Sequence, residues 1–310
     1  RYCGPDRRRK DVNAHYREFL SPEVVSRISR LDLVARFVVE GFITGLHRSP
    51  YHGFSAEFSE HRQYMAGDSL RHLDWKVYAR SDRMYVKRFE EETNLKAHII
   101  LDTSGSMGFR ERGSMTKLRY GSVIAGALTL LMLRQRDSVG LVTFSDSLGK
   151  YVPPRSVQSQ LSEILAALSS CEPDGRTVTG EVLHLMAERM SARGLVIVIT
   201  DLAVDPEPLV RGLKHFRHNG HEVLVFHVLD PMELDFDYDG EVRFTDMETG
   251  STIMTQPALI RGRYRELYDE RIRSMVRSMH EISVDYARFT TDMGFDRALS
   301  QYLAKRKRLH

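Results

Sequence analysis

The feature that most restricts the fold is a series of short apolar runs that alternate with segments of helical periodicity. The apolar runs lie at residues 99–102, 139–144, 195–201 and 223–229, and their length is that of buried strands. Segments with a helical spacing of apolar residues separate them, at residues 118–133, 156–170, 181–190 and 209–218. Strands that alternate with helices in this way predict an α/β fold with a doubly wound, mostly parallel sheet.

Additional elements are expected on either side of this sheet. A helical pattern of apolar residues at 24–38 follows a Ser-Pro pair, which suits the start of a helix. Residues 241–244 and 251–254 resemble two strands joined by a turn, which predicts an inserted β-hairpin near residues 241–256. A helix over 260–279, a last strand over 284–289 and a closing helix over 295–305 complete the expected order.

The segment before the sheet is dense in charged and aromatic residues. It holds the only tryptophan, Trp75, and we expect a hydrogen-bonded, ion-paired module that packs on the main domain. The residues expected to lock the two together are Arg62, Asp68, Arg71, Asp74 and Trp75. A mobile binding arm is the alternative. The predicted division is therefore an N-terminal helical and small β module over residues 1–94 and a main α/β domain over residues 95–310.

Composition narrows the classes of protein that the chain can be. A chain of 310 residues with 42% hydrophobic residues can bury a sizeable core. Its net charge is +3, and basic residues are interleaved with acidic ones except near the two ends, so nucleic acid is not an expected partner. Two cysteines far apart indicate a reducing compartment, and no apolar run is long enough to span a bilayer. We expect a soluble, cytoplasmic protein.

The first apolar run ends in a group of oxygen-bearing side chains. Asp102 follows the run, and Ser104 and Ser106 come after it at alternate positions. Ligand sites in α/β sheets lie just past the carboxyl ends of strands, so we expect these side chains to converge there, with Gly105 permitting a tight turn. Oxygen ligands suit a hard cation such as Mg²⁺. The alternative is that these residues only cap the next helix.

Two later segments add oxygens to the same edge. Thr177 lies in a glycine-containing turn at residues 173–180, where Thr179 could serve in its place, and Asp201 ends the third apolar run. The candidate metal ligands are therefore Asp102, Ser104, Ser106, Thr177 and Asp201.

This pattern resembles the von Willebrand factor A domain with its metal-ion-dependent adhesion site. That family has D-x-S-x-S after the first strand, a threonine in a later loop and an aspartate after a hydrophobic strand, and the sequence has each in that order. The resemblance implies that Ser104, Ser106 and Thr177 contact Mg²⁺ directly, while Asp102 and Asp201 act partly through water. Mn²⁺ and Ca²⁺ are alternative ions.

The sequence departs from that family's pattern at two points. The loop reads Gly175-Arg176-Thr177 where Gly-Gly-Thr is common. Leu202 follows Asp201 where many members have glycine.

A wider resemblance covers residues from about 16 to 303. Gly-Phe-Ser-Ala-Glu-Phe at 53–58, R-x-Y-x-x-G-D-x-x-R at 62–71, Asp-Trp at 74–75 and Glu-Glu-Glu-Thr-Asn at 90–94 are similar to the bacterial family called domain of unknown function 58. The resemblance implies a soluble member of that family and a MoxR-type AAA+ ATPase as partner, in chaperone-like complex assembly or maturation.

We therefore predict a non-catalytic, Mg²⁺-dependent protein–protein interaction module. A carboxylate from an Asp or Glu of the partner would complete the metal's octahedron. The alternative is a metal-dependent hydrolase or phosphoryl-transfer enzyme that uses Asp102. Against it, Ser104 stands where a second aspartate would be needed, the chain has no P-loop, and Ser106 lacks a G-x-S-x-G context.

Overall fold

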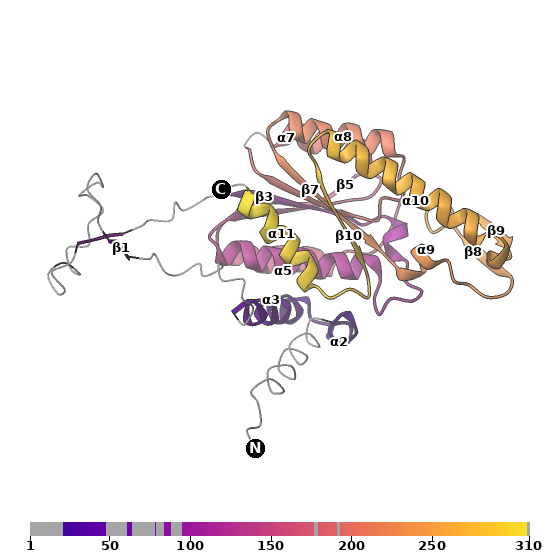
Figure 1. Ribbon diagram of the computed structural model, residues 1–310, viewed down its shortest axis with the longest axis horizontal. Coiled ribbons are helices and arrows are strands. Elements are labelled where there is room, and N and C mark those ends of the chain that lie inside the picture. Colours follow the sequence, from indigo (N-terminus) through magenta and orange to yellow (C-terminus); the bar gives the residue numbers. More distant parts are fainter. Residues whose placement is uncertain are drawn as a thin grey trace, which may run out of the picture.

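The computed structural model describes residues 21–47, 61–63, 78, 84–87, 95–176, 179–190 and 193–308. A six-stranded sheet forms its centre (Figure 1). The strands lie in the order β10 (Asp285–Thr290), β7 (Glu222–Leu229), β6 (Leu195–Thr200), β3 (Lys96–Asp102), β4 (Ser138–Phe144) and β5 (Leu148–Arg155). The edge strand β5 pairs antiparallel with β4, and the other neighbours pair in parallel. The predicted α/β fold with a doubly wound, mostly parallel sheet is confirmed.

The central strands are mostly apolar because both faces of the sheet are covered. All six residues of β6 are buried. In β3, Ile99 and Leu101 belong to the core on one face and Ile100 to the core on the other, as the alternation of a strand requires. Continuous apolar runs are what a parallel sheet buried on both sides needs.

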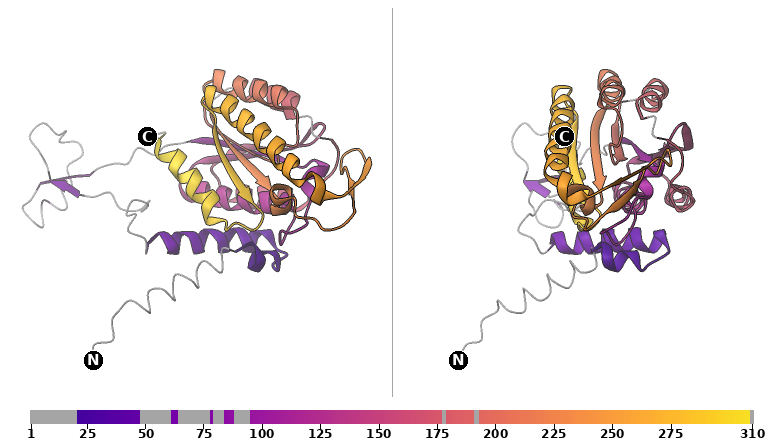
Figure 2. Two further views of the ribbon diagram at one scale, coloured as in Figure 1. Left: turned by 45° about the vertical axis from the view of Figure 1, so that its right-hand side comes forward. Right: turned by 90° about the vertical axis from the view of Figure 1, so that its right-hand side faces the viewer.

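Helices form a layer on each face, and the views in Figure 2 show the sheet between them. On one face lie α5 (Lys117–Arg134), α6 (Ser159–Ser169) and α11 (Asp296–Arg308), and α3 (Leu31–His47) packs on these helices. The other holds α7 (Thr179–Arg189), α8 (Pro206–His218) and α10 (Pro257–Glu281). In the part of the chain that the structure describes, none of the helices is both long and apolar enough to cross a bilayer.

The N-terminal helices cover the outer side of α5. The expected helix at 24–38 is broken into α2 (Pro22–Ser26) and α3, and Arg119 of α5 donates hydrogen bonds to the carbonyl oxygens of Ile28 and Ser29 in the break. Because α3 packs on it, nearly every residue of α5 up to Met132 is buried.

The rest of the predicted N-terminal module is described only in part. β1 (His61–Gln63) pairs antiparallel with β2 (Tyr85–Lys87). Asp68, Arg71, Asp74 and Trp75 lie outside the described residues, as does the side chain of Arg62. The division at residue 94 and the ion-paired contact between the two parts therefore stay predictions.

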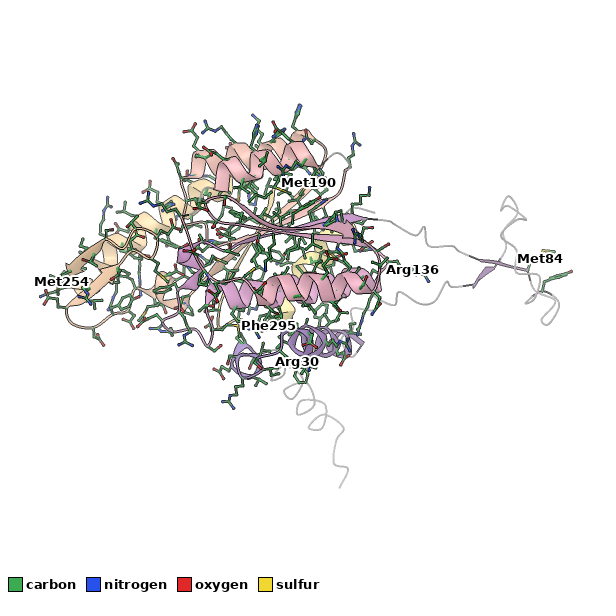
Figure 3. All side chains as sticks on the ribbon, turned by 180° about the vertical axis from the view of Figure 1, so that it is seen from behind. Arg30, Met84, Arg136, Met190, Met254 and Phe295 are labelled. Carbon is green, nitrogen blue, oxygen red and sulfur yellow. The ribbon has the colours of Figure 1, made fainter. Side chains whose placement is uncertain are left out.

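The expected hairpin is present as β8 (Val242–Thr245) and β9 (Thr252–Thr255), which pair antiparallel. It follows the short helix α9 (Pro231–Asp235). Phe236 stacks on Tyr264 of α10 at a centroid distance of 4.0 Å and on Phe244 of β8 at 5.4 Å. We call residues 236–267 the hairpin arm; it includes the first turns of α10 and extends from one end of the sheet, with Met254 near its outer end (Figure 3).

Candidate cation site at the switch point of the sheet

Asp102 and Asp201 stand at the carboxyl ends of two neighbouring parallel strands, β3 and β6. The chain leaves β3 toward α5 on one face and leaves β6 toward α8 on the other face. Such a point, where the strand order reverses, opens a crevice between the two departing loops, and ligands bind there in doubly wound sheets. The structure thus brings Asp102, Ser104, Ser106 and Asp201 together at this edge, which we call the rim.

The carboxylate of Asp102 is buried and hydrogen-bonded on both oxygens. Oδ1 accepts from the backbone N–H of Ser104 at 2.9 Å, and Oδ2 accepts from Oγ1 of Thr200 at 2.7 Å. Burial, together with the nearby charge of Asp201, raises the pKa of Asp102 to about 7. A positive charge at the rim would relieve this repulsion.

The two serines place their hydroxyl groups side by side. Oγ of Ser104 lies 3.2 Å from Oγ of Ser106, at the start of the single turn η2 (Gly105–Gly108). The next long helix, α5, begins only at Lys117, and its cap is Thr116, whose side chain accepts from the N–H of Arg119. The D-x-S-x-S residues are therefore not the cap of α5; Ser104 holds the N-cap position of η2, where its side chain makes no capping hydrogen bond.

Gly105 is required by a close approach of backbone. A Cβ atom at this position would lie 2.8 Å from the carbonyl oxygen of Met247, in the turn of the hairpin. The N–H of Gly105 donates to the carbonyl oxygen of Gly175 at 3.0 Å. The sequence suggested glycine for the conformation of the turn, but the structure gives space as the reason.

The loop that precedes Thr177 is fastened to the rim. Besides the bond to Gly175, the N–H of Asp174 donates to the carbonyl oxygen of Thr103 at 2.9 Å. Gly175 has φ +77, which favours glycine. Thr177 lies outside the described residues, and α7 begins at Thr179, whose side chain is not described. The choice between these two threonines as ligands stays a prediction.

Asp201 has a partner that the sequence did not reveal. Nζ of Lys117 lies 2.7 Å from Oδ2 of Asp201 and 2.7 Å from Oε1 of Glu233, and Oδ1 of Asp201 accepts from the N–H of Ala203 at 3.1 Å. The side chains of Lys117 and Asp201 are only 2% and 1% exposed. Although burial favours its neutral form, the ammonium group holds the pKa of Asp201 below its ordinary value. In the sequence, the one available indication of this contact is the position of Lys117 at the start of an apolar helix.

A neutral histidine, His227, holds the backbone of Asp201 in place. Nε2 of His227 lies 2.9 Å from the carbonyl oxygen of Asp201, and Nδ1 lies 2.8 Å from the hydroxyl of Tyr286. Burial lowers the pKa of His227 to about 3, so the ring is neutral. Its Nε2–H therefore donates to the carbonyl oxygen, and Nδ1 accepts from Tyr286. This pair fixes the backbone at the end of β6.

The donor set of the rim suits a hard cation. It consists of hydroxyl and carboxylate oxygens only, which Mg²⁺ prefers. Since both carboxylates already accept hydrogen bonds, the hydroxyls of Ser104 and Ser106 are the donors best placed for direct contact. Among the described residues, no group of three or more His, Cys, Asp or Glu side chains could hold a metal ion. Any cation site here therefore depends on the hydroxyls.

These features define a doubly wound α/β protein with an oxygen-rich rim at its switch point. Residues 60–274, more than two thirds of the chain, match the model of the family described as protein of unknown function DUF58, and the chain belongs to that family. Uncharacterized proteins of Mycobacterium bovis and Mycobacterium tuberculosis are 25% identical over 232 residues, which cover 74% of this chain and 72% of each relative.

Three solved structures are similar to this chain in fold. BatB from Bacteroides thetaiotaomicron is 18% identical with a TM-score of 0.46, over 68% of this chain and 98% of that chain. An aerotolerance-related membrane protein from Bacteroides fragilis is 20% identical with a TM-score of 0.48, over 68% and 99%. The VWA domain of SpRpn10 is 11% identical with a TM-score of 0.40, over 67% and 95%.

Proposed function

We propose that this protein is a non-catalytic, Mg²⁺-dependent protein–protein interaction module. The observation that carries the proposal is the pair of hydroxyls of Ser104 and Ser106, 3.2 Å apart, beside two buried carboxylates at the switch point. When bound there, Mg²⁺ would supply positive charge and an open coordination position for an Asp or Glu carboxylate of a partner. Mn²⁺ and Ca²⁺ prefer oxygen ligands too.

Each residue of the rim has a distinct part in this proposal. Ser104 and Ser106 contact the ion through their hydroxyls, with a threonine of the 173–180 loop as a third donor. Asp102 and Asp201 act through water, because their oxygens already accept hydrogen bonds from Thr200, Lys117 and backbone N–H groups. Hydroxyl and water ligands leave the ion most of its charge, which strengthens its attraction for a carboxylate.

The partner that we propose is a MoxR-type AAA+ ATPase, with this protein as its adaptor in chaperone-like assembly. Membership in the DUF58 family supports this choice through the resemblance described above. The surface beside the rim also suits a protein, because the described residues expose a group of large apolar side chains on the hairpin arm. They are Met247, Ile253, Met254, Leu259, Ile260 and Leu267. Since Met247 packs against Gly105, a partner at the rim would also meet the arm.

The alternative, a hydrolase or phosphoryl-transfer enzyme, would use Asp102 as nucleophile. Both oxygens of this carboxylate accept hydrogen bonds, and its pKa is raised to about 7 because it is buried beside Asp201. A nucleophile needs an accessible, ionised oxygen with a base nearby. The arrangement favours a role for Asp102 in holding the rim together.

Calorimetric titration of Mg²⁺ tests the proposal. Wild type, Asp102→Ala, the isosteric Asp102→Asn and Ser104→Ala/Ser106→Ala are titrated alone and with the ATPase, and circular dichroism confirms that each variant is folded. We expect Mg²⁺ and the ATPase to strengthen each other's binding in the wild type. The rim variants lose this coupling, while Ser162→Ala, at an exposed position of α6, keeps it. Equal ATPase affinity of Asp102→Ala and wild type in Mg²⁺ would refute the proposal.

A further inference from the structure

A buried lysine occupies one side of the candidate cation site. The ammonium group of Lys117 contacts the carboxylates of Asp201 and Glu233, each at 2.7 Å, and its side chain is 2% exposed. Asp201 is the carboxylate at the end of β6 that would act on the cation through water. The positive charge that neutralises Asp201 therefore comes from the chain itself.

The surroundings of Lys117 keep its ammonium group in place. Oε1 of Glu233 holds the ammonium, while Oε2 accepts from the N–H of Asp230 at 2.7 Å in the capping box of α9. Nζ also lies over the ring of Phe109, 5.6 Å from the ring centroid. With an almost fully buried side chain and two carboxylate contacts, the ammonium group of Lys117 is held against Asp201.

Stability alone does not account for such a group. The free-energy cost of removing charged groups from water often exceeds the gain from their mutual attraction. Well-packed apolar side chains can therefore replace a whole buried ion pair without loss of stability. A fixed ammonium beside a carboxylate has one consequence that an apolar side chain lacks. It repels any second cation that approaches the same carboxylate, and this repulsion is large where water is excluded.

We propose that Lys117 sets the cation affinity of the rim, keeping it so low that a divalent cation is held firmly only together with the partner's carboxylate. This inference rests on the proposed function and adds its regulation. The rim then responds to the ion and the partner jointly, since neither binds firmly alone. Glu233 is a positioning residue that holds the ammonium against Asp201.

The test is the Mg²⁺ affinity of the protein alone, measured by calorimetry, in Lys117→Met/Glu233→Gln. This double variant removes the ammonium beside Asp201 together with the carboxylate of Glu233 that contacts it, so the net charge is unchanged. We expect Mg²⁺ to bind at least tenfold more tightly than to wild type, and this gain to disappear when Asp102→Ala is added. Affinity equal to or weaker than wild type, or a gain that survives Asp102→Ala, overturns the inference.

Two further variants control for folding and for charge. Lys117→Gln/Glu233→Gln keeps an amide N–H for Asp201 and gives the same test if the apolar variant does not fold. Arg211→Met/Glu207→Gln removes an exposed pair on α8, 3.0 Å apart, and should leave Mg²⁺ affinity unchanged. If the wild type bound the ATPase equally well with and without Mg²⁺, the proposed function would be contradicted. The role of Lys117 is decided separately, by the Mg²⁺ affinities of the variants measured without the ATPase.

Discussion

The carbonyl oxygen of Met247 lies 2.8 Å from the point where a Cβ atom at Gly105 would stand. One residue belongs to the turn of the hairpin and the other to the D-x-S-x-S segment of the rim. Backbone packs directly on backbone here, so the hairpin arm and the candidate cation site form one continuous surface. A change at either residue should be felt at the other.

Gly105→Ala is expected to lower the free energy of unfolding by about 1–3 kcal/mol, because the new methyl group must push the hairpin turn away. Gly262→Ala in α10 is the matched control. A Cβ there meets open space in the described structure, so alanine should stabilise the helix by up to about 1 kcal/mol. Urea unfolding measures both. Equal effects of the two substitutions would contradict the close packing at Gly105.

Lys117→Met alone is expected to destabilise the protein by about 3–5 kcal/mol, since it leaves Asp201 buried without its counter-charge. Arg211→Met, which breaks an exposed pair with Glu207, should cost less than about 1 kcal/mol. Urea unfolding in the presence of a chelator gives both values. A loss below 1 kcal/mol for Lys117→Met would show that the ion pair with Asp201 contributes little.

Acid should destabilise the protein through His98 in β3. Burial, with smaller effects of His221 and Lys96, lowers the pKa of His98 from 6.5 to about 4. Below about pH 6.5, His98 therefore binds a proton in the unfolded chain but not in the folded protein. Stability is lost as the pH falls from about 6.5 toward 4. The loss between pH 7 and pH 5 is about 2 kcal/mol.

Urea unfolding at pH 7 and pH 5 measures this loss, and His98→Gln removes the titrating group. The difference between the two pH values should shrink by about 2 kcal/mol in the variant. An unchanged difference would assign the acid sensitivity to other groups.

Ile253→Asp/Met254→Asp should weaken binding of the ATPase at least tenfold and leave Mg²⁺ uptake unchanged. These two side chains of β9 are 64% and 61% exposed, so the change should not disturb the core. Fully burying an apolar side chain of this size is worth about 1.5–3 kcal/mol relative to leaving it exposed, and an aspartate at either position loses that gain. Val157→Asp, at a position 49% exposed before α6, is the control. Comparable affinities of the double variant and the control would exclude the arm from the interface.

The main strands and helices could be predicted because each has a clear local pattern. The runs at 195–201 and 223–229 correspond to β6 and β7, and the helix expected at 260–279 lies within α10. The strand β5 was missed. It contains Pro153 and Pro154 and is partly exposed, and proline is accepted at the edge of a sheet but carries no strand signal of its own.

The rim was predictable only as far as its residues are neighbours in the chain or end an apolar run. Asp102, Ser104 and Ser106 form a local pattern, and the strand ahead of Asp201 showed where that residue lies. The contacts of Lys117 could not be predicted, because its partners are 84 and 116 residues away along the chain. A lysine near a helix start normally indicates a solvated end, and only the three-dimensional arrangement shows that it is buried.

The covering of α5 by α3 has a practical consequence for handling the protein. In a fragment that begins at residue 95, the side of α5 that packs on α3, where Gly126 lies close to Ala35, would be open to water. Such a fragment would contain the complete sheet and rim, but it would expose an apolar surface on α5 that favours self-association. Expression of the isolated sheet domain should therefore give aggregates that have nothing to do with its biological binding surface.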